Sequence, residues 1–315
     1  MRVLVTGATG YLGRAIVAAL GERGHTPIAF ARRASASGIG AERIDGDVCD
    51  AGAVDRAVAG CDVVCHAAAL VSVWTRDRSV FDRVNVEGTR HVLEAVQRHG
   101  ARRCVYTSSF LALPPAGRTT PIAANDYQRT KALALRVADD VAARGVPIVT
   151  LFPGVIYGPG ARTEGNLVAR LLRDRIEGRL PGIVGPDRTW SFAFIDDVAR
   201  AHAAAVDAPA PAGRYGIGGE NLPQRAIFDW LREAHAISVP WTVPPALARM
   251  AGWCEEQRAR LTGAMPLLTR DAVEVFEHDW PVDSTLAIRD LGYRITPLAD
   301  GLAATWPTLG TAAGA

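Results

Sequence analysis

The N-terminal run Val3-Leu4-Val5-Thr6-Gly7-Ala8-Thr9-Gly10-Tyr11-Leu12-Gly13 decides the fold of this chain. A short aliphatic strand leads into three glycines spaced three apart, and Ile16, Val17 and Leu20 then recur at helical spacing up to Gly24. A strand, a glycine loop and a helix in this order present backbone N–H groups and a helix N-terminus to a pyrophosphate. Because the glycine motif follows the first strand directly, it indicates a dinucleotide-binding loop rather than a plain tight turn.

Strands and helices continue to alternate as far as Gly154. The pattern predicts strands at 3–5, 26–31, 41–46, 61–65, 103–107 and 146–151, with a helix over 80–99 and another ending near Gly145. Such alternation is typical of an α/β fold, a Rossmann-type doubly wound parallel sheet with right-handed crossovers.

Beyond residues 157–160 the pattern changes to helices and proline-punctuated loops rich in tryptophan. We therefore expect a dinucleotide-binding domain over 1–155, joined by a strand and a helix at 190–207. A smaller, mostly helical substrate-binding part would comprise 156–189 and 208–310, followed by a frayed tail at 311–315.

Composition narrows the function classes. The 315 residues carry 35 basic and 33 acidic side chains, and a formal charge of +2 gives no reason to expect nucleic acid or an anionic membrane as a partner. Five cysteines without a Cys-x-x-Cys pair suggest neither a disulfide framework nor a metal site. No run approaches the roughly 18 apolar residues of a membrane span, and the first residues resemble a strand rather than a secretory signal. The expected location is cytoplasmic.

Lys131 is the only lysine in the chain, and it follows Tyr127 by four residues. On a helix these two side chains share one face, and Asn125 or Asp126 can cap the start of that helix. A free phenol is a poor proton donor at neutral pH, and a nearby cation stabilises the phenolate and lowers its pKa. The pair therefore suggests a tuned general acid/base. The alternative is an exposed helix with an incidental Tyr and Lys.

Arg32-Arg33 stand at the end of the second predicted strand, where NAD-binding folds usually place an acidic residue for the ribose hydroxyl. No Asp or Glu occurs between Glu22 and Glu42. Because a guanidinium pairs bidentately with phosphate, this strand end suits the 2′-phosphate of NADP. Two solvated loop arginines are the alternative explanation.

Taken together, the motifs resemble those of the extended short-chain dehydrogenases/reductases. The resemblance runs from the glycine loop at 6–13 to the segment at 283–293. Between them lie Asp47-Val48, His66-Ala67-Ala68-Ala69, Asn85-Val86-Glu87-Gly88-Thr89, Thr107-Ser108-Ser109, Tyr127-x-x-x-Lys131 and Phe194-Ile195-Asp196-Asp197-Val198, in the family's order and spacing.

The resemblance implies a catalytic group. In it Ser109 orients the substrate oxygen, Tyr127 transfers the proton, Lys131 binds the nicotinamide ribose and lowers the tyrosine pKa, and Asn85 supports the geometry. The choice between Ser108 and Ser109 stays open, as does the pocket's shape, because only 18 residues separate Ser109 from Tyr127. The implied cofactor contacts are Gly7, Thr9, Gly10, Tyr11, Leu12, Arg32, Asp47, Val48, Ala67, Ala68, Ala69, Tyr127, Lys131, Pro153 and Gly154, with NADP(H) preferred over NAD(H).

Two branches of the family compete for this chain. Nucleotide-sugar epimerases and dehydratases carry an Arg-Asp-Phe run whose arginine grips a diphosphate, where this chain has Trp190-Ser191-Phe192. An indole in place of a guanidinium removes charge and adds apolar area. The sequence therefore favours the dihydroflavonol-reductase-like and 3β-hydroxysteroid-dehydrogenase-like branch, which acts on apolar carbonyls or alcohols. The expected pocket residues are Val71, Val73, Trp74, Phe110, Leu111, Tyr157 and Trp190.

The function predicted from the sequence is NADPH-dependent reduction of a ketone or aldehyde on an apolar small molecule, or oxidation of the corresponding alcohol. The alternatives are a sugar-nucleotide epimerase with tightly held NAD and a non-catalytic NADP sensor. The sensor would not need both Tyr127 and Lys131. The reaction's physiological direction, the substrate's identity and the oligomeric state, with a homodimer among the options, stay open.

Overall fold

The computed structural model describes residues 1–309 except 73, 161–162, 164 and 209–212. Its centre is a seven-stranded sheet in which every pairing is parallel, with strand order β10-β6-β5-β4-β1-β2-β3. This arrangement confirms the predicted α/β Rossmann-type fold. The strands are β1 (Arg2–Thr6), β2 (Thr26–Ala31), β3 (Glu42–Asp45), β4 (Val63–His66), β5 (Arg103–Thr107), β6 (Ile148–Pro153) and β10 (Gly213–Ile217).

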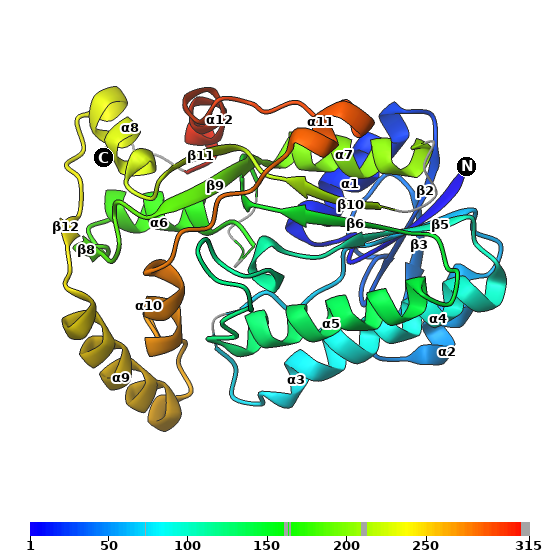
Figure 1. The fold of residues 1–315 in the computed structure, drawn as a ribbon, viewed down its shortest axis with the longest axis horizontal. Coiled ribbons are helices and arrows are strands. Elements are labelled where there is room, and N and C mark those ends of the chain that lie inside the picture. The colour runs from blue at the N-terminus through cyan, green and yellow to red at the C-terminus, as the bar shows by residue number, and fades with distance from the viewer. Residues whose placement is uncertain (73, 161–162, 164, 209–212, 310–315) are drawn as a thin grey trace.

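Helices cover both faces of the sheet (Figure 1). One layer holds α1 (Tyr11–Glu22), α7 (Ile195–Asp207) and α11 (Thr285–Leu291), and the other holds α2 (Ala51–Val58), α4 (Gly88–His99) and α5 (Asp126–Ala142). Alternation along β1 explains the double cover, because Val3 and Val5 pack into the first core and Leu4 into the second.

The helix predicted over 80–99 is continuous but changes its winding. It begins as α3 (Ser79–Phe81), passes through the π-helical segment η1 (Asp82–Glu87) and continues as α4. π-Helical turns inside α-helices are often found at functional sites. This one contains the buried Asn85.

A smaller part lies at one end of the sheet (Figure 1). It contains a three-stranded sheet ordered β11-β9-β7 and a two-stranded sheet of β12 and β8, with helices around them. Its elements are β7 (Val155–Tyr157), α6 (Leu167–Ile176), β8 (Gly182–Ile183), β9 (Thr189–Phe194), β11 (Glu220–Pro223), α8 (Ala226–His235), β12 (Trp241–Thr242), α9 (Pro245–Thr262), α10 (Arg270–Phe276) and α12 (Leu298–Thr305). Two 3₁₀ turns, η2 (Phe110–Ala112) and η3 (Trp306–Leu309), complete the assignment.

The strand expected at 190–195 forms, but it does not join the large sheet. β9 pairs with β7 and β11, while β10 occupies the edge beside β6. Gly154 explains the branching, because a Cβ there would lie 2.5 Å from the Ser191 carbonyl oxygen. The absent side chain lets β9 cross close to the chain as it leaves β6 for β7. The helix that was predicted to follow this strand, up to residue 207, is α7, and it packs on the large sheet. The tail at 311–315 lies outside the described residues.

None of the described helices combines the length and the apolar character that crossing a bilayer requires.

Candidate active site

The glycine loop between β1 and α1 packs directly onto the segment after β4. Gly7 has φ +69°, and a Cβ added to it would lie 2.7 Å from the Ala68 Cα. At Gly13 an added Cβ would lie 2.1 Å from the Gly7 carbonyl oxygen. Both positions therefore require glycine. Gly10 is the N-cap of α1, so the backbone N–H groups at the start of this helix can face an anion without an intervening side chain. This geometry fits a dinucleotide pyrophosphate.

The other predicted cofactor residues line the carboxyl ends of the parallel strands. Asp47 follows β3 and accepts a hydrogen bond from the Cys49 amide at 2.9 Å. Val48 is buried against Gly88, because a Cβ added to Gly88 would lie 2.9 Å from the Val48 Cγ2. The Tyr11 hydroxyl donates to the Gly158 carbonyl at 2.9 Å, which ties the glycine loop to the smaller part. Thr9 lies in the glycine loop and Leu12 in the first turn of α1. The remaining positions follow β4 or lie at the end of β6: Ala67, Ala68, Ala69, Pro153 and Gly154.

Arg32 and Arg33 lie in a turn after β2 that three other side chains hold in place. The Asp45 carboxylate accepts hydrogen bonds from the Ser35 amide at 2.8 Å and the Ser35 hydroxyl at 2.6 Å. Arg43 donates to the Ser35 carbonyl at 3.1 Å, and Arg14 donates to the carbonyls of both Ser37 and Thr9.

The two arginines of this turn are exposed, and neither makes a hydrogen bond or ion pair with any described residue. The turn is thus fixed while its guanidinium groups stay free for an anion.

The predicted Tyr127–Lys131 helix is α5, and Asn125 caps it by accepting a hydrogen bond from the Gln128 amide at 2.8 Å. Lys131 is 3% exposed, and its Nζ donates to the Thr107 carbonyl at the end of β5, at 2.8 Å. Tyr127 is half-buried on the same helix face.

The two candidate serines differ in their surroundings. A hydrogen bond with the Ser109 side chain lowers the pKa of Tyr127, and the Ser109 hydroxyl also accepts from the Leu111 amide at 3.2 Å. The Ser108 hydroxyl is buried and faces a different phenol, because a hydrogen bond with Ser108 acts on the pKa of Tyr106. The geometry therefore favours Ser109 as the serine that faces the phenol.

The electrostatics differ from the expectation that Lys131 lowers the tyrosine pKa. Burial raises the pKa of Tyr127, and the Ser109 hydrogen bond offsets that rise only in part. Lys131 is itself desolvated, and burial lowers its pKa to about 7. Its Nζ donates a hydrogen bond to the Thr107 carbonyl. Tyr127 therefore stays protonated at neutral pH.

Asn85 connects the loop after β4 to the catalytic helix. Its Oδ1 accepts from the Leu70 amide at 2.7 Å, and its Nδ2 donates to the Leu70 carbonyl at 3.2 Å and to the Thr130 hydroxyl at 3.0 Å. Thr130 directly precedes Lys131, so the π-helical turn holds α5 in register with this loop.

A buried hydrogen-bond network surrounds His66, and the sequence did not predict it. The Thr6 hydroxyl donates to His66 Nδ1 at 2.8 Å and accepts from the Ala68 amide. His66 Nε2 donates at 3.0 Å to the Thr89 hydroxyl, which donates in turn to the Asn85 carbonyl. Burial, with a smaller contribution from Lys131, lowers the pKa of His66 to about 3, so the ring stays neutral.

Tyr106 was also missed, because its place in β5 predicts only core packing. Its ring stacks on His66 with centroids 5.8 Å apart and lies 5.3 Å from Lys131 Nζ. The order His66-Ala67-Ala68 after a strand was the one sequence signal that pointed to this region.

A buried Lys131 makes stability depend on pH. Above about pH 7 the folded protein has released this proton while the unfolded chain keeps it, so rising pH favours the folded state. Between about pH 7 and about pH 9 the unfolding free energy of the wild type should rise by about 2 kcal/mol relative to Lys131→Met. Denaturant unfolding of both proteins across this range tests the prediction. A constant difference would contradict it.

The predicted substrate residues are mostly core residues. Trp190 is 4% exposed and stacks on Phe276 with centroids 5.1 Å apart, and Tyr157 is fully buried against Phe194. Phe110 packs edge-on against Trp280. These contacts account for all three side chains by packing, and substrate contact stays a prediction.

The other expected pocket residues are less buried. Trp74, Leu111 and Val71 are half-buried or exposed near the predicted strand ends. Val73 lies outside the described residues.

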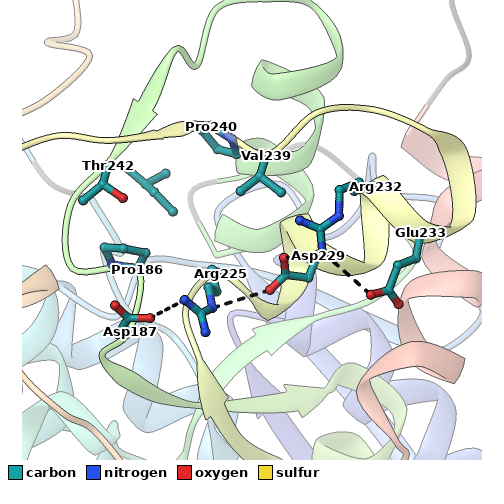
Figure 2. A pocket seen from close by; sticks show the side chains of 10 residues that line it. Pro186, Asp187, Arg225, Asp229, Arg232, Glu233, Val239, Pro240 and Thr242 are labelled. Atoms are coloured by element: carbon teal, nitrogen blue, oxygen red, sulfur yellow. Dashed lines mark ion pairs between the residues drawn. The ribbon is translucent and has the colours of Figure 1, made fainter.

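The smaller part also contains an open groove of about 530 Å³ between β8, α8 and β12. Figure 2 shows the ion pairs of its lining: Arg225 pairs with Asp187 and Asp229, and Arg232 pairs with Asp229 and Glu233. None of the predicted site residues lines this groove, and its charges satisfy one another. We therefore assign it no chemistry.

Comparison with known proteins identifies the family. Residues 3–218 match the model of the NAD dependent epimerase/dehydratase family. "Sterol demethylase protein B" of Methylococcus capsulatus is 32% identical, with 93% of each chain covered. "2-alkyl-3-oxoalkanoate reductase" of Stenotrophomonas maltophilia is 34% identical, covering 93% of this chain and 94% of that protein.

A solved structure of UDP-glucuronic acid 4-epimerase from Bacillus cereus, in complex with UDP-glucuronic acid and NAD, has the same fold. The TM-score is 0.77 at 22% identity, over 98% of this chain and 99% of that one. The family model covers more than half of the sequence, and the expected motifs lie at the strand ends. The chain therefore belongs to the NAD-dependent epimerase/dehydratase family, the extended short-chain dehydrogenases/reductases, and is an NAD(P)-dependent enzyme.

Proposed function

We propose that this enzyme reduces a ketone or aldehyde on an apolar substrate and uses NADPH as its hydride donor. The observation that carries the proposal is the grouping of Ser109, Tyr127 and Lys131 at the carboxyl end of β5, beside a glycine loop shaped for a dinucleotide. Ligands bind outside the carboxyl ends of the strands in open α/β sheets.

In this proposal each protein group has a defined task. The Ser109 hydroxyl donates to the carbonyl oxygen and orients it, and Tyr127 transfers a proton to that oxygen as it becomes negative. Tyr127 is protonated at the start of the reduction, and the hydrogen bond with Ser109, which acts against the rise in pKa caused by burial, favours release of its proton. Lys131 fixes the ribose side of the site, and Asn85 keeps α5 in register.

The cofactor preference rests on Arg32. Arg32→Ala should raise the Kd for NADPH by more than about tenfold and barely change that for NADH, because one charge-assisted phosphate contact contributes about 1.5–3 kcal/mol. Fluorescence titration with both nucleotides measures this difference. Arg136→Ala, an exposed arginine on α5, is the matched control and should bind both nucleotides as the wild type does. Equal affinity of the wild type for NADPH and NADH would refute the assignment.

The apolar substrate is supported by two observations. The family's diphosphate-binding arginine position is occupied by Trp190, which here is buried among aromatic side chains and offers no guanidinium. The relatives named above include one whose name describes reduction of 2-alkyl-3-oxoalkanoates, which are ketones that carry alkyl chains as well as a carboxylate. Trp190→Arg would bury a charge at a packed position and destabilise the protein, so that substitution cannot separate binding from folding.

A substrate panel tests the assignment directly. Purified protein should oxidise NADPH in the presence of long-chain or ring-bearing ketones and should leave UDP-sugars unchanged. Burial of apolar area at about 25 cal/mol per Å² should make kcat/KM rise with ketone size. Tightly bound NAD in the purified protein, with UDP-sugar turnover and no ketone-dependent NADPH oxidation, would replace this function by epimerisation.

A further inference from the structure

The helix α9 buries its small residues and exposes its large apolar ones, the reverse of an ordinary surface helix. Its buried side consists of the small residues Ala248, Gly252 and Ala259, together with Glu256. A Cβ on Gly252 would lie 2.9 Å from the Arg270 amide nitrogen, so the helix approaches the start of α10 at backbone distance. The bulky apolar residues of α9 are therefore left for the opposite side.

Those bulky residues form one exposed surface, which we call the α9 face: Leu247, Met250, Trp253 and Leu261, which are 53%, 61%, 50% and 86% exposed. At 100° per residue they fall on a single arc opposite Ala248, Gly252 and Ala259. Trp241 in β12 and Leu267 in the loop after α9 are also exposed, at 79% and 82%. Surface helices normally bury such side chains, so a contiguous exposed set indicates an interaction site.

The charges around the α9 face suit an anionic partner. The two acidic residues of α9 are neutralised, Glu255 by Arg258 and Glu256 by Arg270. Arg260 bonds only the Gln257 side chain and pairs with no described carboxylate. Near the end of α9, Arg76 lies against Gly263 and is likewise without a carboxylate partner among the described residues. Arg260 acts on Glu256 through its charge, but that carboxylate is already ion-paired with Arg270, so positive charge is in excess beside the apolar strip.

The position of α9 leaves its outer side open. It packs chiefly against α10 and lies at the edge of the smaller part, away from the large sheet (Figure 1). A lone helix at an edge offers a narrow, convex strip, whereas a stable interface between two copies needs about 800 Å² from each. A fluid lipid surface adapts to such a strip, and tryptophan is favoured at membrane interfaces.

We propose that the α9 face binds the surface of a lipid bilayer, with α9 lying in the plane of the interface. Leu247, Met250, Trp253 and Leu261 enter the boundary between headgroups and acyl chains, and Arg260 and Arg76 contact anionic headgroups. The near-neutral net charge of the whole chain gave no sign of this surface, because the cations that matter are local. The inference stands whichever substrate the active site takes.

Sedimentation with vesicles tests the proposal. The wild-type protein should pellet with phosphatidylcholine vesicles, and more strongly when phosphatidylglycerol is included. Met250→Ser/Trp253→Ser should raise the lipid concentration for half-binding at least about tenfold, since two large apolar side chains no longer enter the lipid. The matched control is Leu286→Ser/Ile288→Ser on α11, whose side chains are 47% and 49% exposed, and it should bind like the wild type.

Arg260→Ala provides a second, charge-based measurement. It should weaken binding to phosphatidylglycerol-containing vesicles about fivefold at low salt and leave binding to pure phosphatidylcholine unchanged, as expected for about 1 kcal/mol per cation near an anionic surface. NADPH titration of every variant verifies that the nucleotide fold is intact.

Two results would overturn the proposal. One is a wild-type protein that stays in the supernatant with both vesicle types. The other is equal pelleting of the α9 and α11 variants. A lipid-free dimer that Met250→Ser/Trp253→Ser converts to monomers, detected by analytical ultracentrifugation in a protein that ignores vesicles, would assign the α9 face to a second copy of the chain instead.

Discussion

Replacing Tyr127 with phenylalanine should lower kcat for ketone reduction by about 10²–10⁴-fold, the usual contribution of a positioned proton donor. Phenylalanine keeps the ring that packs at the start of α5 and removes only the hydroxyl that bonds Ser109. NADPH affinity and thermal stability should therefore change little, which separates a catalytic role from a structural one.

Steady-state kinetics with the best ketone of the substrate panel, together with NADPH titration, provide the measurement. Tyr215→Phe is the matched control, because Tyr215 lies on the edge strand β10, two strands from β5, and is none of the predicted site residues. Its kcat should equal that of the wild type. Normal turnover by Tyr127→Phe would remove this residue from the mechanism.

Lys131→Arg should be nearly as damaging as loss of the phenol, although both are basic side chains. The Lys131 ammonium is enclosed and has one described acceptor, the Thr107 carbonyl, at 2.8 Å. A guanidinium is planar, larger and brings five N–H donors into that enclosure, so α5 or the end of β5 must shift. A displacement of about 1 Å at an active site can cost about 10²-fold in rate, and we expect a loss in kcat/KM of that order.

An arginine-to-lysine substitution at a surface position tests whether exchanging these two basic residues affects activity in general. Arg136→Lys lies on the same helix, is exposed and should leave kcat/KM unchanged. If Lys131→Arg retained near-normal turnover, the argument from the chain's only lysine would fail, and the buried cation would have a role in folding alone.

Local signals determined much of this protein. The glycine spacing at 7, 10 and 13, the strand lengths and the Tyr127–Lys131 offset are properties of short stretches, so the sequence predicted the α/β fold and the common helix face. It also predicted a cap at Asn125 or Asp126, and the structure shows that Asn125 is the cap. Family membership followed from the order of these motifs, and the family model confirms it.

Other features depend on contacts between distant segments, and only the tertiary structure decided them. The sequence of β9 predicts a strand but not the sheet that it joins. The close approach of Ser191 to Gly154 places β9 in the small sheet. Burial, which no single stretch encodes, determines which serine faces Tyr127. It also determines the direction in which the pKa of Tyr127 shifts. The α9 face is the clearest case. Its composition suggested only an apolar, aromatic half, and the contact of Gly252 with α10 determined which side of the helix is left to the solvent, because backbones can approach that closely only where side chains are small.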